Sequence, residues 1–73
     1  MAKKVVAAYP DSYSCYKVLF DTGEERTFSA SFAVASVSVN GQAVTVTGTG
    51  SNASVVIYFF DESGNPSSYK VVR

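Results

Sequence analysis

The sequence predicts an all-β domain, a small antiparallel β-barrel or β-sandwich of six or seven short strands. Its 12 valines and 5 threonines stand against one leucine and one glutamine, a composition that favours strands over helices. Apolar residues alternate with polar ones along most of the chain, and no helical spacing of apolar residues persists for three turns. Turn-forming clusters interrupt this alternation about every ten residues, as in small barrels and sandwiches.

Seven segments have the strand pattern, and glycine, proline, asparagine and aspartate gather between them. The predicted strands cover residues 3–8, 13–20, 26–32, 35–39, 42–47, 53–60 and 67–73.

Two predicted hairpins sort their side chains into an apolar and a polar face. Asn40-Gly41, read as a two-residue type I′ turn, places Val37 opposite Val44. The hairpin around Gly23 gathers one apolar face, formed by Tyr16, Val18, Phe20, Phe28, Ala30 and Phe32. The apolar phase changes between residues 33 and 36, which predicts a bulge or a sharp bend there.

The segment 53–60 is apolar on both of its faces. One interpretation is a central strand with its second face covered by a loop or by the N-terminal strand. The other is that one face packs against another chain, since a domain this small often gains stability by oligomerising. If the core takes Val55, Ile57 and Phe59, the interface residues are Val56, Tyr58 and Phe60.

Length and charge limit the classes of function. The 73 residues form a single compact domain, residues 1–73. Six basic and six acidic residues leave no net charge, so nothing draws the chain toward nucleic acid or anionic lipid. The short apolar run after the two N-terminal lysines predicts no signal peptide, and no segment is long enough to cross a membrane. We expect a cytoplasmic protein, or a virion protein if the source is a phage.

Residues suited to catalysis are scarce. The chain has no histidine, and its six carboxylates all fall in predicted turns, where solvation rather than acid–base chemistry is expected. Cys15 has Lys17 two residues away but no base nearby in the sequence, and a packed cysteine is the simpler interpretation. We therefore predict no enzyme activity, no catalytic residue, no metal site, no cofactor and no small-molecule substrate.

Basic residues concentrate near the two ends of the chain. If the terminal strands pair, they form a basic edge made of Lys3, Lys4, Lys70 and Arg73. Lysines on an edge strand protect it against aggregation, and this interpretation is preferred. The alternative is a surface for single-stranded nucleic acid, which also needs aromatic side chains beside the charges.

Two short segments resemble known families. Residues 16–27, YKVLFDTGEERT, are similar to the central hairpin of SH3-like and Tudor-type barrels. Residues 43–50, AVTVTGTG, are similar to strands of bacterial and phage immunoglobulin-like domains. These resemblances imply different folds, so the chain is assigned to neither family.

Together these features predict a non-enzymatic structural or assembly protein, for example a phage or virion component. It would associate with copies of itself or with a larger complex. The alternative is a small SH3-like binding module that contacts a protein, for example as an inhibitor of a host or defence protein, or contacts nucleic acid.

Overall fold

The computed structural model describes residues 2–73, and within them it contains seven strands and no helix. The predicted all-β class is confirmed, and every predicted strand is present with ends shifted by a few residues. In chain order the strands are β1 (Val5–Pro10), β2 (Cys15–Phe20), β3 (Glu25–Ser29), β4 (Val34–Asn40), β5 (Ala43–Gly48), β6 (Val55–Phe60) and β7 (Pro66–Val71).

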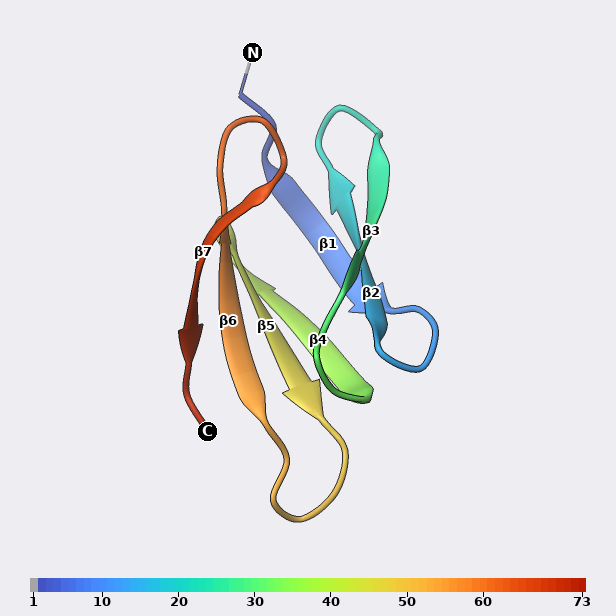
Figure 1. The fold of residues 1–73 in the computed structure, drawn as a ribbon. Helices are drawn as coiled ribbons and strands as arrows, with labels where there is room; N and C mark the ends of the chain where they lie inside the picture. The colour runs from blue at the N-terminus through green and yellow to red at the C-terminus, as the bar shows by residue number, and fades with distance from the viewer. Residues whose placement is uncertain (1) are drawn as a thin grey trace.

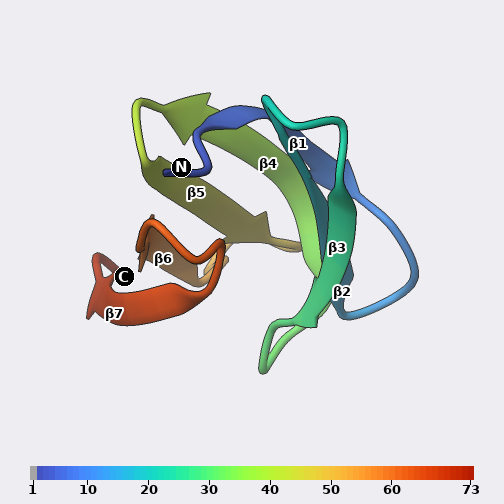
Figure 2. The same cartoon turned by 90° about the horizontal axis from the view of Figure 1, so that it is seen from above.

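The strands form two antiparallel sheets, which follow each other along the chain. One has the order β1-β2-β3 and the other has the order β4-β5-β6-β7 (Figure 1). β1 lies beside β4 and runs in the opposite direction, so the two sheets together curl around one core. Viewed from above, the curl begins at β3 and ends at β7 (Figure 2). β3 and β7 are each paired on one side only, and the curl is not closed.

One glutamine side chain bridges the two sheets where β1 begins and β4 ends. The Gln42 Oε1 atom accepts a 2.9 Å hydrogen bond from the Val5 N–H, and its Nε2 atom donates a 3.2 Å bond to the Lys3 carbonyl. At the other end of the same contact, the Val34 N–H donates to the Tyr13 carbonyl at 2.9 Å. The amide of Gln42 thereby replaces the backbone pairing that β1 and β4 lack.

Replacing Gln42 with alanine should lower the free energy of unfolding by about 1–3 kcal/mol, because the N–H of buried Val5 loses its acceptor. Urea unfolding measures the loss. Thr49→Ala, in the exposed β5–β6 turn, is the control and should change stability by less than about 0.5 kcal/mol. Equal stability of the two variants would contradict the bridging role.

The core lies on the inner, concave side of the curl. Its fully buried side chains are Tyr16, Val18, Phe20, Val44 and Val46. The predicted apolar face of the β2–β3 hairpin is confirmed, since Tyr16 pairs with Phe28 and their rings are in contact. Gly23 has a φ of 89°, as its turn requires.

The β4–β5 hairpin differs from the prediction by two residues in register. Asn40 pairs with Ala43, and Val37 pairs with Val46 instead of Val44. The turn is therefore Gly41-Gln42, and a φ of 64° at Gly41 with no positive φ at Gln42 fits a type II′ turn rather than type I′. A shift of two residues leaves every side chain on the same face, so alternation could not distinguish the two registers. The expected irregularity is confirmed as a bulge between Val34 and Ser36.

Within residues 2–73, no helix has the length and apolar character needed to span a membrane.

Candidate functional site

The two faces of β6 are used in the reverse of the expected way. Val56 and Phe60 are only 7% and 5% exposed, and the half-buried Tyr58 packs against the core. The proposed interface residues Val56, Tyr58 and Phe60 therefore belong to the inner face of this chain. Phe59 lies on the outer face and is 40% exposed. Periodicity shows that β6 has two apolar faces, but it cannot show which of them turns inward.

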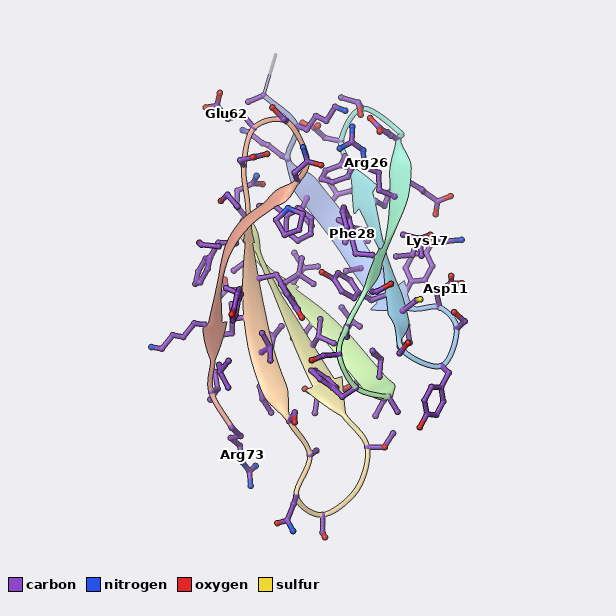
Figure 3. All side chains as sticks on the ribbon, in the orientation of Figure 1. Asp11, Lys17, Arg26, Phe28, Glu62 and Arg73 are labelled. Atoms are coloured by element: carbon purple, nitrogen blue, oxygen red, sulfur yellow. The ribbon has the colours of Figure 1, made fainter. Side chains whose placement is uncertain are left out.

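Aromatic rings form a continuous row from the core to the surface. The ring centroids of Phe60 and Phe28 are 5.2 Å apart, and those of Phe28 and Tyr16 are 5.7 Å apart. Tyr16 stacks on Tyr58 at 5.4 Å, and Tyr58 meets Tyr69 of β7 at 6.3 Å. Figure 3 shows Phe28 directed from β3 toward the core. The row ends at Tyr69, which is 67% exposed although it lies on the inner face.

Burial raises the pKa of Tyr16, and it also raises the pKa of Tyr58, where the nearby Tyr69 adds a smaller effect. Both phenols stay neutral in the folded chain at a pH where an unfolded chain begins to ionise. Their contribution to stability is therefore fully present below the unfolded pKa near 10 and is lost as the pH rises through the folded pKa.

We expect the free energy of unfolding to decrease steadily above about pH 10. Urea unfolding of wild type and of Tyr16→Phe across this range provides the test. The phenylalanine variant, which cannot ionise at position 16, should lose stability less steeply. An identical slope for the two proteins would show that Tyr16 does not cause the alkaline loss.

β7 is the most exposed strand, since all six of its residues are exposed. Its pairing with β6 includes a 2.8 Å bond from the Val72 N–H to the Val55 carbonyl. Residues opposite each other in an antiparallel pair alternate between hydrogen-bonded and non-bonded pairs. The backbone N–H of Lys70 therefore also points toward β6, whereas the backbone N–H groups of Tyr69 and Val71 point away from it. The unpaired edge of β7 thus presents hydrogen-bonding groups beside two exposed apolar side chains.

β3 has the other unpaired edge. The Ala30 N–H donates to the Ser14 carbonyl, and the Phe20 N–H donates to the Glu24 carbonyl, so the even-numbered residues face β2. The N–H groups of Glu25, Thr27 and Ser29 consequently point outward. We call the unpaired edges of β3 and β7, together with the exposed inner side chains Tyr69 and Val71, the open side.

Arg26 closes the upper end of the open side. Its guanidinium donates to the Ser63 carbonyl at 3.1 Å, the Gly64 carbonyl at 3.2 Å and the Asn65 Oδ1 atom at 3.1 Å. Arg26 therefore ties β3 to the β6–β7 turn. The Glu24 carboxylate binds both Lys3 and Arg26, and these hydrogen bonds lower the pKa of that carboxyl group.

The expected basic edge does not form. The terminal strands lie in different sheets, where β1 pairs with β2 and β7 pairs with β6. Lys3 is bound to Glu24 near the β6–β7 turn, and Lys4 lies beside it in sequence. Arg73 is at the opposite end of the molecule (Figure 3). Basic residues near the two ends of the chain do not lie together, because each terminal strand pairs with a different strand.

Groups with chemical reactivity are dispersed. Cys15 is half-buried, and its Sγ atom lies 3.8 Å from the Ser29 hydroxyl. Among residues 2–73, no three acidic or cysteine side chains are grouped so that they could hold a metal ion. No pocket was found in the part of the chain that the structure describes. The open side is accordingly the surface with the most distinctive chemistry.

Comparisons of the chain with protein-family models, with curated protein sequences and with solved structures found no match.

Proposed function

We propose that this chain is a non-enzymatic assembly protein that pairs the edge of β7 with a strand of another protein molecule, in a homo-oligomer or in a larger complex. The two sheets are, in this proposal, an incomplete β-barrel. The observation that supports it is the edge of β7, where unpaired backbone groups lie beside the exposed side chains of Tyr69 and Val71. An unprotected edge of this kind is a template for pairing with another chain.

The edge has little of the protection that monomeric proteins give to such strands. Pro66 stands at the first position of β7, where it leaves the rest of the edge able to bond. Lys70 is the only charged residue in the strand, and its side chain is on the outer face. The apolar residues Tyr69 and Val71 face the open side instead.

A charge placed on the open side tests the proposal. Light scattering should show that wild type associates as its concentration rises, and that Val71→Lys stays at the monomer mass of 7.8 kDa. Val72→Lys is the matched control, because Val72 is similarly exposed but lies on the outer face. It should associate like wild type.

Two outcomes would contradict the proposal. Equal association of wild type and both variants would place the contact elsewhere on the molecule. A wild-type chain that remains monomeric at every concentration would contradict self-association and would favour the second candidate, a module that binds a different protein.

The open side itself favours that second candidate. A surface of exposed aromatic and aliphatic side chains beside an unpaired strand edge suits an extended peptide as well as a second copy. A monomer whose β7 amides become protected by a peptide would identify this function.

A further inference from the structure

We infer that the open side accepts one extended segment of a partner protein, which runs antiparallel to both β3 and β7 and binds both edges as an eighth strand. This inference rests on the second function proposed above, the binding of a different protein, and specifies the partner of that surface. Three observations support it: the directions of the two edges, the phase of their outward-facing residues, and the charge beside them.

The first observation is the number of strands. Each neighbour in the order β3-β2-β1-β4-β5-β6-β7 runs opposite to the last, including β1 beside β4 (Figure 1). An odd number of alternating strands leaves the two end strands, β3 and β7, running in the same direction. They cannot form an antiparallel pair with each other, whereas one additional strand between them would be antiparallel to both.

The second observation is the phase of the two edges. Residues whose N–H groups leave β7 at its edge have side chains on the inner face, as at Tyr69 and Val71. Residues whose N–H groups leave β3 have side chains on the outer face, as at Thr27. Consider one strand placed between them. Its residues with inner side chains would form backbone hydrogen bonds to β7, and the residues between them, with outer side chains, would form backbone hydrogen bonds to β3. One regular strand meets both requirements.

The third observation is charge. Lys70 lies on the outer face of β7 and forms no ion pair with any residue of 2–73. Arg73 follows Lys70 by three residues along the chain, and β6 and β7 carry no carboxylate. An occupant with an acidic residue on its outer side would complement these charges.

These features define the occupant. It has apolar side chains at alternate positions, where they would cover Tyr69 and Val71, and polar or acidic side chains between them. Its length is limited, because the Arg26 contacts with the β6–β7 turn close the upper end of the open side. The occupant therefore lies beside Thr27 and Ser29 on one edge and beside Tyr69 and Val71 on the other.

A synthetic peptide with blocked ends, in which valine alternates with glutamate and threonine, is a suitable probe. Amide hydrogen exchange of dilute wild-type protein, followed by NMR, should slow at Thr27 and Ser29 and also at Tyr69 and Val71 when the peptide is added. The amide of Lys70, which already faces β6, is the internal control and should change little. A peptide with lysine in place of glutamate should bind about threefold more weakly, because it repels Lys70.

Edge variants supply an independent measurement. Thr27→Pro removes an outward N–H from β3, and Val71→Pro removes one from β7, each at an unpaired edge where proline is tolerated. Each should weaken peptide binding about fivefold, while Thr27→Val and Val71→Thr, which keep the N–H, should not. If a proline variant fails to fold, the exchange measurement on wild type still decides the matter.

The outcomes separate this inference from the proposed function. Protection at Tyr69 and Val71 alone would mean that a strand adds to β7 only, and would overturn the inference while leaving the proposed function intact. Protection of all four amides by raised protein concentration, without peptide, would assign the site to a second copy and overturn the assignment to a different partner. A chain that stays monomeric and shows no protected amide with saturating peptide would contradict both.

Discussion

Tyr16→Ala should lower the free energy of unfolding by about 3–5 kcal/mol, the range for removing a large aromatic side chain from a core. Tyr16 is only 1% exposed, and its ring contacts both Phe28 of β3 and Tyr58 of β6. It therefore connects the first sheet to the second. A domain of this size has a total stability of about 4–11 kcal/mol, so this single variant should remove much of it.

Urea unfolding with matched variants tests this expectation. Tyr16→Phe keeps the ring and should stay within about 1 kcal/mol of wild type. Tyr13→Ala removes a tyrosine that is 82% exposed, and should change stability by less than about 0.5 kcal/mol. If Tyr16→Ala cost no more than Tyr13→Ala, the aromatic row would not be the connection between the sheets.

Arg26→Ala should cost about 2 kcal/mol, because it removes charge-assisted hydrogen bonds to three acceptors of the β6–β7 turn and to Glu24. Its guanidinium also lies 5.9 Å from the centre of the Phe20 ring. The turn has little room to rearrange, since a Cβ atom at Gly64 would lie 3.2 Å from Phe20 and from Lys3. Without Arg26, its three acceptors in this closely packed turn lose their hydrogen-bond donor from β3.

The control for Arg26 is Lys70→Ala, which removes an exposed cation without an ion pair among residues 2–73. We expect it to change stability by less than about 0.5 kcal/mol. Arg26→Lys keeps the charge but lacks the planar fork, and should retain only part of the stability. A full recovery by lysine would show that charge alone matters at this position.

The sequence predicts all seven strands and the inward face of the β2–β3 hairpin, because alternation and turn residues act locally. The sequence does not determine the register of the β4–β5 hairpin, since Val37 has a valine opposite it in either register. The predicted inner and outer faces of β6 are the reverse of those observed, because Val56 and Ile57 on its two faces are equally apolar. These choices depend on which strands become neighbours, and local periodicity contains no information about neighbours.

The sequence does not predict the open side, for the same reason. The predicted basic edge assumed that the first and last strands pair, but β1 lies beside β4 and leaves β7 at the end of the sheet. Two weak signals existed in the sequence. The seven predicted strands are an odd number. The last of them, residues 67–73, lacks the run of large apolar residues that the strand before it, residues 53–60, contains.

Amide hydrogen exchange of the wild-type chain at low and at high concentration tests the central claim most directly. Tyr69 and Val71 have N–H groups that leave β7 at its unpaired edge, and Lys70 between them faces β6. The account predicts rapid exchange at Tyr69 and Val71 in dilute solution, strong slowing of both as the molecules associate, and little change at Lys70. Association without any slowing at Tyr69 and Val71 would contradict the claim that this protein assembles through the edge of β7.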